Sequence, residues 1–283
     1  MNGCFSTANG YFRGLTTQSE NYLNAHSKRG NMAPSHAPAH RTTQRILEIL
    51  TLIAAEKDGL SLTDLCRAMD APKGSLYPIL KTMSDQRFLS QDPTSGRYHM
   101  GAMTALCGRA FEQNDGTFKL LNECARQVVD ACGETCQVGF RDGSYVRYLL
   151  RVDSPQPVRL ASVPGVTLPL HTTAIGKALL SALPNQEVDQ LVKIPWERLT
   201  SHTLATPELL HLELDQVRAG DFAYDRGETS EGVTCIALPV HKGDQIPWGI
   251  GVTTPAFRLD QHKEALIKEV LAASRATLES LLA

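Results

Sequence analysis

The 283-residue sequence lacks the short motifs that mark the common catalytic and nucleotide-binding sites. It contains no G-x-S-x-G nucleophile motif, no H-E-x-x-H zinc motif, no Walker phosphate loop and no G-x-G-x-x-G dinucleotide fingerprint. Each of these motifs supplies a local backbone or ligand geometry that its chemistry requires. The sequence therefore predicts no catalytic residue, no metal ligand and no cofactor.

Long apolar runs and paired cysteines are also missing. No run approaches eighteen apolar residues and the first nine residues contain no Lys or Arg, so we expect neither a membrane span nor a signal peptide. The seven cysteines are scattered without a C-x-x-C pair, which argues against a disulfide framework and against a zinc site. Reduced thiols of this kind are typical of a cytoplasmic protein.

The chain has no overall excess of positive charge, since its formal net charge is −2. The distribution is uneven: residues 1–100 contain 11 Lys and Arg against 8 Asp and Glu, a balance of +3. Residues 101–283 contain 17 against 22, a balance of −5. The sign of this asymmetry is right for a nucleic-acid contact in the N-terminal part, although its size is small.

The length and the 42% apolar content allow two domains, each with its own core. Residues 1–40 are rich in Asn, Ser, Thr, Gly, His and Pro and show no periodicity, so we expect a disordered tail. Met32 lies within this tail. One hypothesis is that Met32 is the natural start of the protein, which an intact-mass measurement would test.

Residues 41–100 show the pattern of three short helices followed by a hairpin. From Thr43 to Ala55 the apolar residues recur at helical spacing and predict one buried stripe: Ile46, Leu47, Ile49, Leu50 and Ile53. A second helix begins at Ser61, because Ser61 and Asp64 have the spacing of a capping box. We expect this second helix to bury Leu62, Leu65 and Met69.

A third helix and a hairpin complete this domain. From Phe88 to Met100 apolar and polar residues alternate around a turn at Asp92–Gly96, which indicates two short antiparallel strands. Three helices followed by such a hairpin are the layout of a winged helix-turn-helix. The layout presents one helix of the right size to the major groove of DNA.

Pro78 constrains where the third helix begins. In the middle of a helix a proline costs about 3 kcal/mol, so we expect the helix to begin at Ser75, with Pro78 in its first turn. The residues expected to contact double-stranded DNA are Lys73, Ser75, Leu76, Tyr77 and Lys81 from this helix and Arg97 from the hairpin. A solvated charge on the hairpin is an equally good interpretation of Arg97.

The remaining sequence predicts a linker helix over residues 101–116 and a second domain over residues 117–283. Met103, Leu106 and Phe111 form an apolar stripe on the linker, which we expect to be a dimer helix. In the second domain we expect strands over 135–141, 144–152, 158–163, 233–240 and 246–253, and helices over 117–132, 170–183, 185–192, 207–219 and 259–282. This order predicts an α+β domain with a mainly antiparallel sheet.

Several stretches resemble IclR-family bacterial transcriptional regulators. In the first domain they are Arg45-Ile-Leu-Glu-Ile-Leu, Leu62-Thr-Asp-Leu, Pro72-Lys-Gly-Ser-Leu-Tyr-Pro-Ile-Leu-Lys-Thr-Met and Gly96-Arg-Tyr. In the second they are Leu168-Pro-Leu-His-Thr-Thr-Ala-Ile-Gly-Lys-Ala-Leu-Leu and Phe222-Ala-Tyr-Asp-Arg-Gly-Glu-Thr-Ser-Glu-Gly-Val-Thr-Cys-Ile-Ala-Leu-Pro-Val. Pro78 stands where the family most often has Arg, and Gly74-Ser75 where it has Ser-Thr, so the operator sequence is expected to differ.

The resemblance implies a ligand-responsive regulator that binds operator DNA as a homodimer or tetramer. Its GAF-like C-terminal domain is expected to bind a small organic or aromatic acid. The implied effector contacts are Ala174, Ile175, Asp225, Cys235, Gly251 and Thr253. Gly251 stands where relatives can have a hydroxyl residue, which is expected to leave more room for a ligand.

The residues themselves support a pocket in this region. The helix that follows His171 begins with free N–H groups suited to a carboxylate, and Tyr148 and Leu150 are candidates for an apolar wall. Each assignment has a simpler alternative. Cys235 can be a buried small apolar residue and Asp225 a turn or cap residue, while Lys177 is expected to be an exposed helix charge.

Two other functions remain open at this point. One is a thiol-dependent enzyme that uses Cys235, for which a nearby base such as His171 or His241 would be needed. The other is a sensor with a winged helix that no longer binds DNA, which Pro78 and the weak charge asymmetry suggest. Salt-dependent binding to the DNA upstream of its own gene would separate the second alternative from a regulator.

Overall fold

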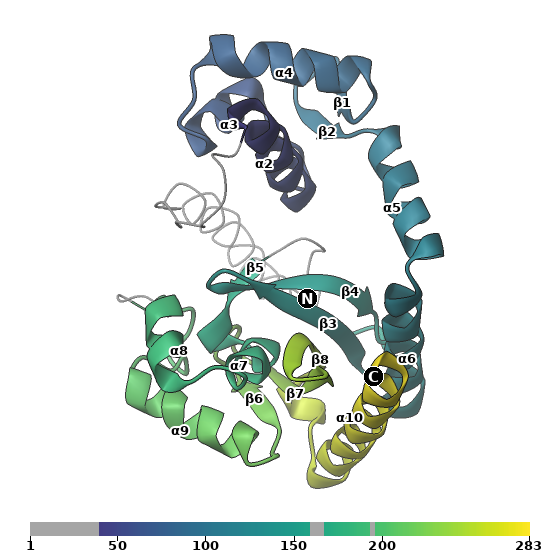
Figure 1. Cartoon of the computed structure of the whole chain (residues 1–283), viewed down its shortest axis with the longest axis vertical. Coiled ribbons are helices and arrows are strands. Elements are labelled where there is room, and N and C mark those ends of the chain that lie inside the picture. The colour runs from purple at the N-terminus through teal and green to yellow at the C-terminus, as the bar shows by residue number, and fades with distance from the viewer. Residues whose placement is uncertain (1–39, 159–166, 193–195) are drawn as a thin grey trace, which may run out of the picture. The chain divides into compact units, whose positions relative to one another are not determined.

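A computed structural model describes residues 40–158, 167–192 and 196–283, and these residues form two compact units divided after Phe111 (Figure 1). The predicted tail, with the hypothetical start at Met32, lies outside the described residues, apart from His40. So does most of the strand predicted over 158–163, of which Val158 alone is described, in a bend. The two units are therefore treated separately.

The first unit is a winged helix-turn-helix, as predicted. It consists of α2 (Arg41–Ala55), α3 (Leu62–Ala68), α4 (Lys73–Asp85), β1 (Leu89–Gln91) and β2 (Tyr98–Met100). The two strands pair antiparallel, and Leu60 adds an isolated bridge to Tyr98. One apolar core holds the three helices and the hairpin together, and its fully buried members include Ile49, Leu52, Leu65, Leu76 and Leu80.

Side-chain caps fix the starts of the first two helices. The Nδ1 atom of His40 accepts from the backbone N–H of Thr43, and the predicted capping box of Ser61 and Asp64 is confirmed. The predicted stripe on α2 is wrong at one position, because Leu47 is 60% exposed while Leu52 is fully buried. Leu47 lies one residue off the i, i+3, i+4 spacing of Ile46, Ile49 and Leu50, so it points to one side of the core.

The third helix begins earlier than predicted. The α4 helix starts at Lys73 after the extended residue Pro72, so Pro78 is its sixth residue and lies inside the helix. A proline there cannot donate the N–H that would reach the carbonyl of Gly74. The helix forms nevertheless because its opposite side buries Leu76, Leu80 and Met83 in the core. Burial of these three side chains offsets the cost of the missing hydrogen bond.

Two consecutive helices follow the hairpin. The α5 helix (Ala102–Asn114) has no buried residue. The α6 helix (Gly116–Cys132) begins immediately after Asp115, whose carboxylate accepts from the N–H of Phe118 at 2.6 Å. It ends at Gly133, which adopts a left-handed conformation that glycine tolerates well. The helix predicted over 101–116 corresponds to α5 and the one predicted over 117–132 to α6, with Asp115 between them.

The second unit contains a six-stranded antiparallel sheet in the order β5-β4-β3-β8-β7-β6. Its strands are β3 (Thr135–Asp142), β4 (Tyr145–Val152), β5 (Thr167–Pro169), β6 (Ala223–Arg226), β7 (Val233–Lys242) and β8 (Gln245–Pro255). The predicted mainly antiparallel sheet is confirmed. The edge strand β6 was not predicted, because four residues are too few to display an alternation.

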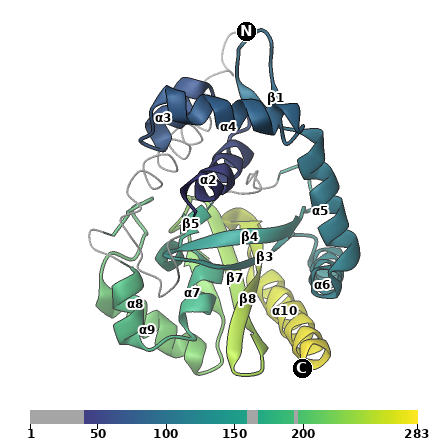
Figure 2. The ribbon, with the colours of Figure 1, turned by 45° about the horizontal axis from the view of Figure 1, so that its top comes forward.

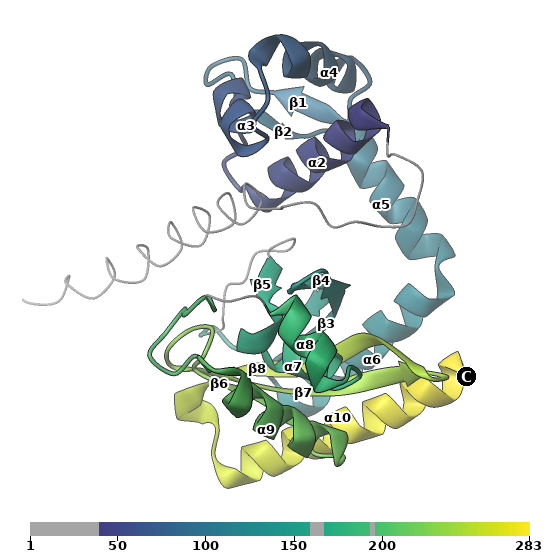
Figure 3. The ribbon, with the colours of Figure 1, turned by 60° about the vertical axis from the view of Figure 1, so that its left-hand side comes forward.

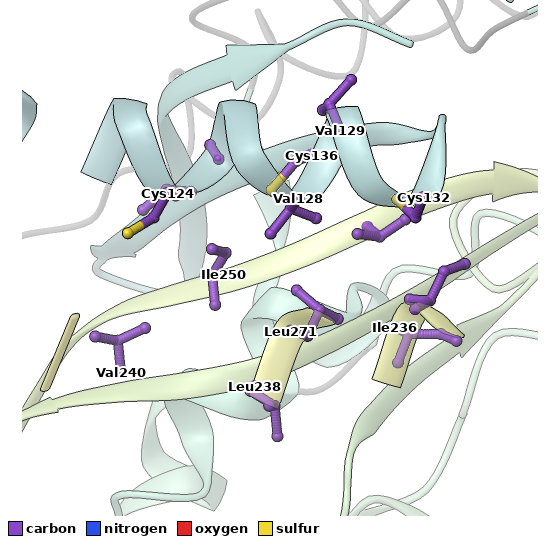
Figure 4. Packing of buried hydrophobic residues seen from close by; sticks show 14 of the residues in the cluster. Cys124, Val128, Val129, Cys132, Cys136, Ile236, Leu238, Val240, Ile250 and Leu271 are labelled. Atoms are coloured by element: carbon purple, nitrogen blue, oxygen red, sulfur yellow. The ribbon is translucent and has the colours of Figure 1, made fainter. Parts of the chain in front are cut away.

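Helices cover both faces of this sheet (Figures 2 and 3). One face packs against α6 and the closing helix α10 (Gln261–Leu282). The core on that side includes Cys124 and Val128 of α6 above Ile236, Leu238 and Ile250 of the sheet (Figure 4). The other face packs against α7 (Ala174–Leu180), α8 (Asn185–Leu191) and α9 (Pro207–Arg218). In the described part of the chain, no helix combines the length and apolar character needed to span a membrane.

Candidate functional site

The candidate effector site is a cavity of about 50 Å³ on the α7 face of the sheet. Seven of the eight predicted effector residues line it: Tyr148, Ala174, Ile175, Asp225, Cys235, Gly251 and Thr253. Six further residues complete the wall, namely Gln137, Leu168, Thr173, Thr229, Ser230 and Val233. The structure thus brings together residues from the start of α7, from all six strands of the sheet and from the loop after β6.

Leu150 is the predicted effector residue that does not line this cavity. Simple alternation would place Tyr148 and Leu150 on the same face of β4. A β-bulge prevents this, because Val138 pairs with Leu150 and Gly139 with Tyr148, which leaves Leu149 as an extra residue. Leu150 therefore points to the opposite face and packs in the core formed with α6 and α10.

The polar side of the cavity is a row of side chains across neighbouring strands. Asp225 of β6 pairs with Cys235 of β7, and Cys235 pairs with Thr253 of β8. The Sγ atom of Cys235 lies 3.2 Å from Oγ1 of Thr253, and that hydroxyl donates to Oε1 of Gln137 at 3.2 Å. A ligand in the cavity would meet a carboxyl, a thiol, a hydroxyl and an amide within one row.

Asp225 both lines the cavity and shapes a turn, the two alternatives that the sequence left open. Its side chain is 2% exposed, and Oδ1 accepts from the N–H groups of Glu228 at 2.6 Å and Thr229 at 3.2 Å. It therefore shapes the loop after β6 and also lines the cavity. Burial raises the pKa of the Asp225 carboxyl, although these hydrogen bonds oppose the shift.

The environment of Cys235 does not favour thiolate chemistry. Burial and the neighbouring Asp225 carboxylate raise the pKa of the Cys235 thiol far above its usual range. The two histidines that could have served as a base are engaged elsewhere. His171 has its Nε2 atom 3.1 Å from the carbonyl oxygen of Glu197, and His241 pairs with Glu279 at 2.6 Å. Among the described residues, no group of three His, Cys, Asp or Glu side chains is arranged to hold a metal ion.

Lys177 is a correction to the sequence interpretation, which placed it on the surface. The side chain is fully buried beside the cavity, where Nζ donates to Glu228 at 2.6 Å, to Glu213 at 2.9 Å and to the carbonyl oxygen of Tyr224 at 2.7 Å. Burial raises the pKa of Glu228 to about 7, against the opposing effect of Lys177. The signal in the sequence was the position of Lys177 inside an otherwise apolar helix, with Ala178 and Ile175 beside it.

Gly251 also differs from its expected role. A Cβ atom at this position would lie 3.1 Å from Cγ1 of Ile175, 2.9 Å from Cβ of Ala237 and 3.0 Å from the carbonyl oxygen of Ile236. The space expected for a ligand above Gly251 is therefore occupied by protein atoms. A serine or threonine would not fit here without movement of its neighbours.

The candidate DNA-binding face is the exposed side of α4. Lys73, Tyr77 and Lys81 are exposed on it, and Tyr77 is 53% exposed. Ser75 is partly buried. Leu76 is fully buried in the core of the first unit and faces away from this side, so it is not available for a DNA contact. Pro78 lies between Tyr77 and Lys81 on the exposed side.

Arg97 ties the hairpin to the start of α3. Its guanidinium donates to the carbonyl oxygen of Gly59 at 2.6 Å and lies 3.7 Å from the Asp64 carboxylate. The side chain retains 41% exposure, so part of the guanidinium faces solvent. Arg97 therefore positions the hairpin, a role that neither sequence interpretation included.

Comparison with known proteins gives matches to both units. The family model "IclR helix-turn-helix domain" matches residues 42–93, and "Bacterial transcriptional regulator IclR C-terminal" matches residues 114–278. The chain belongs to the IclR family of bacterial transcriptional regulators. It is 30% identical to the HTH-type transcriptional regulator BhcR of Paracoccus denitrificans over 87% of this chain and 89% of that protein.

Solved structures of the IclR family have the same fold. A regulator from Alicyclobacillus acidocaldarius has a TM-score of 0.80 and 20% identity, over 87% of this chain and 100% of that one. An IclR homolog from Microbacterium hydrocarbonoxydans, described as complexed with 4-hydroxybenzoate, has a TM-score of 0.68 and 19% identity. It covers 85% of this chain and 98% of its own. The IclR assignment makes this chain a DNA-binding transcriptional regulator.

Proposed function

We propose that this IclR-family regulator binds a small organic or aromatic acid in the cavity between α7 and the sheet, and that binding changes its affinity for operator DNA. The observation that carries the proposal is the convergence of Ala174, Asp225, Cys235 and Thr253 on one cavity. These residues come from segments far apart in the sequence. A cavity with a few polar groups on a mostly apolar wall is typical of a small-molecule site.

The polar groups of the cavity suit an acid with an additional oxygen function. None of the described residues that line the cavity carries a positive charge. An acid would therefore be held by hydroxyl, amide and backbone donors and by the Asp225 carboxyl. Burial raises the pKa of this carboxyl, which disfavours its charged form beside an anionic ligand. The complex described for the Microbacterium hydrocarbonoxydans homolog supports the same class of ligand.

In the proposed switch, the exposed side of α4 is the DNA-binding surface. Lys73 and Lys81 would contact phosphates, while Tyr77 would reach base edges or sugars in the major groove. Two copies are needed to read two half-sites, and a ligand that favours one domain arrangement over the other would change the affinity for both together. We place the homodimer contact on α5, where Leu106 is 53% and Phe111 46% exposed. The protein would act in the cytoplasm.

A thermal-shift screen with small organic acids tests the ligand part of the proposal. A ligand that binds the folded state raises the unfolding temperature of the wild type. Thr253→Val keeps the shape of the side chain and removes its hydroxyl, and Asp225→Asn removes the carboxylate, so both are expected to weaken the shift. His241→Ala, on an exposed residue remote from the cavity, is the control. An undiminished response in both cavity variants would contradict the assignment.

Binding of the protein to the DNA upstream of its own gene tests the DNA-binding part of the proposal. The logarithm of the affinity should fall linearly with the logarithm of the salt concentration, and Lys73→Gln should reduce the slope by roughly one. Lys242→Gln, on an exposed lysine of the second unit, should leave the slope unchanged. A response that stays flat from low salt upward would instead favour a sensor that does not bind DNA.

A further inference from the structure

A second cavity, of about 390 Å³, lies on the face of the sheet that packs against α6. Its volume falls within the roughly 300–1,000 Å³ that is usual for a small-molecule site. All the residues that line it belong to the second unit, and most come from α6 and β4. Gln137 and Tyr148 also line the effector cavity, so the two cavities share these two residues.

The bulge in β4 gives the second cavity an apolar wall. In a regular strand Leu149 and Leu150 would point to opposite faces of the sheet. Because Leu149 is the extra residue of the bulge, both leucines pack with the core on the α6 side. Phe118 of α6 packs against the same core and adds an aromatic ring to the wall. The cavity can therefore hold a flat apolar group.

Three positive side chains line this cavity, against the single carboxylate of Glu112. Lys119 and Arg126 lie seven residues apart on α6, which places them on one side of the helix, roughly 10 Å apart along its axis. Both are exposed, and no ion pair within the described residues engages either of them. This local excess contrasts with residues 101–283 as a whole, which contain 17 Lys and Arg against 22 Asp and Glu.

The third cation, Arg151, is held in place by the protein. Its side chain is only 12% exposed, and its Nε atom donates to the Asp153 carboxylate at 2.6 Å. The planar guanidinium of arginine matches the geometry of phosphate oxygens better than an ammonium group does. The cavity therefore has one fixed positive charge on β4 and two mobile ones on α6.

We propose that this second cavity binds a nucleotide, at a site separate from the effector cavity. The phosphate meets the three cations, and the base lies against Phe118 and the two leucines, since aromatic side chains are good stacking partners for bases. Glu112 and Asn122 can bind the amino and ring nitrogen groups of a base, whereas Glu112 would repel the second charge of a dicarboxylic acid. Inorganic phosphate would leave the apolar wall unused. The inference does not depend on the acid proposed for the effector cavity.

Calorimetric titration of the full chain tests this inference. The probes are the four ribonucleoside monophosphates AMP, GMP, CMP and UMP, with the four nucleosides and inorganic phosphate titrated separately. We expect at least one nucleotide to bind the wild type at least tenfold more tightly than its own nucleoside and than inorganic phosphate. Its affinity should fall as the salt concentration rises, because part of the binding is electrostatic.

Variants at exposed positions locate the bound nucleotide without disturbing the core. Arg126→Gln should weaken binding of that nucleotide at least fivefold, and Arg126→Lys, which keeps the charge, should weaken it less. Arg141→Gln is the matched control, because Arg141 is an exposed arginine of β3 that does not line the cavity. Lys73→Gln on the DNA-binding side of α4 and Thr253→Val in the effector cavity should also leave the affinity for the nucleotide unchanged.

Three results would overturn the proposal. The first is that none of the four nucleotides binds. The second is that inorganic phosphate binds as tightly as the best nucleotide, which would mean that the cations hold an ion only. The third is that the affinity for the nucleotide is unchanged in Arg126→Gln but falls in Thr253→Val or Lys73→Gln, which would place the nucleotide in the effector cavity or on α4. None of these results bears on the binding of an acid in the effector cavity.

Discussion

Pro78 is costly for folding and lies on the surface that we propose contacts DNA. It occupies the exposed side of α4, between Tyr77 and Lys81, and removes one hydrogen bond from that helix. The core side of α4 gains nothing from a proline at this position. The presence of Pro78 is therefore better explained by the exposed surface of α4 than by the stability of the first unit.

Replacement of Pro78 by alanine is expected to stabilise the first unit. The change restores the N–H that reaches the Gly74 carbonyl and relieves the ring contact, so the free energy of unfolding should rise by up to about 3 kcal/mol. Urea denaturation of the full chain, followed by far-UV circular dichroism, measures the change. Lys81→Ala, on the same exposed side, should alter stability by less than about 0.5 kcal/mol. A Pro78→Ala variant that is equal to the wild type or less stable would show that α4 does not lose this hydrogen bond.

The cysteines offer a second test at the scale of single residues. The raised pKa of Cys235 predicts slow alkylation by iodoacetamide at neutral pH, because the thiolate is the reactive species. Cys107 is exposed on α5 and serves as the internal reference for a fast reaction. Peptide mass spectrometry after timed labelling gives both rates in one sample. Alkylation of Cys235 as fast as that of Cys107 would revive the thiol-enzyme alternative.

At the scale of elements, Lys177 connects both walls of the cavity. It lies on α7, whose first turn lines the cavity, and binds Glu228 in the loop after β6, where Thr229 and Ser230 line the cavity too. Within the part of the chain that the structure describes, the buried Oε2 atom of Glu228 has no hydrogen-bond partner, and burial raises the pKa of this carboxyl to about 7. The loop is thus held by a carboxyl that exchanges its proton near neutral pH.

This pair predicts a pH dependence of stability. The folded state keeps the proton of Glu228 up to a pKa of about 7, whereas the unfolded chain releases it near the ordinary value of 4.5. Between these pH values the folded state binds more protons, so this carboxyl contributes less stability as the pH rises. Relative to Glu228→Gln, the wild type should lose on the order of 3 kcal/mol of unfolding free energy from pH 4.5 to 7.5. Denaturant titrations at several pH values measure this difference.

A neighbouring carboxylate provides the control for that prediction. Glu231 lies three residues further along and is exposed, so Glu231→Gln should follow the wild-type pH profile. Parallel pH profiles of the wild type and Glu228→Gln would mean that Glu228 remains ionised in the folded state throughout this range.

The helices and strands also show which elements can be predicted from sequence patterns. The helical stripe of α6 and the alternation in β3, β4, β7 and β8 predict the elements well, because each repeats over at least two turns or four residue pairs. The short strand β6 offers no such repeat. The sequence places the start of α4 too late. The local free-energy cost of Pro78 favours a start at Ser75, but the helix begins earlier because Leu80 and Met83 are buried in the core, which is a tertiary effect.

The candidate site was predictable where the family resemblance supplied positions and the sheet kept its alternation. The prediction is wrong at Leu150. A bulge at Leu149 reverses the face of the sheet to which the following side chains point, and this bulge leaves no mark in the sequence. The burial of Lys177 depends on Glu213 and Glu228, which are distant in the chain.

At the scale of the whole molecule, the proposed switch requires a connection between the two units and a second copy of the chain to make two DNA contacts. The α5 helix carries exposed apolar residues and has no buried residue of its own. An exposed apolar stripe on a helix is expected to pair with another such stripe. We therefore expect α5 to be a contact between copies of the chain.

Light scattering after size exclusion tests this expectation. The wild type should elute as a dimer or tetramer, and Leu106→Glu should shift it to a smaller species, because a charge would be buried in the contact. Glu112→Lys changes the charge on the side of α5 opposite Met103 and should preserve the assembly. An assembly unchanged by Leu106→Glu would move the contact to another surface.

In the proposed switch, a ligand in the cavity of the second unit changes DNA binding by the first. The most direct measurement is the dissociation constant for the DNA upstream of its own gene, by fluorescence anisotropy at fixed salt, with and without a small organic acid that binds the protein. We expect the dissociation constant of the wild type to change at least fivefold, within the usual range of coupling energies, and that of Thr253→Val to change little. Equal dissociation constants with and without the bound acid, or an undiminished change in Thr253→Val, would contradict it.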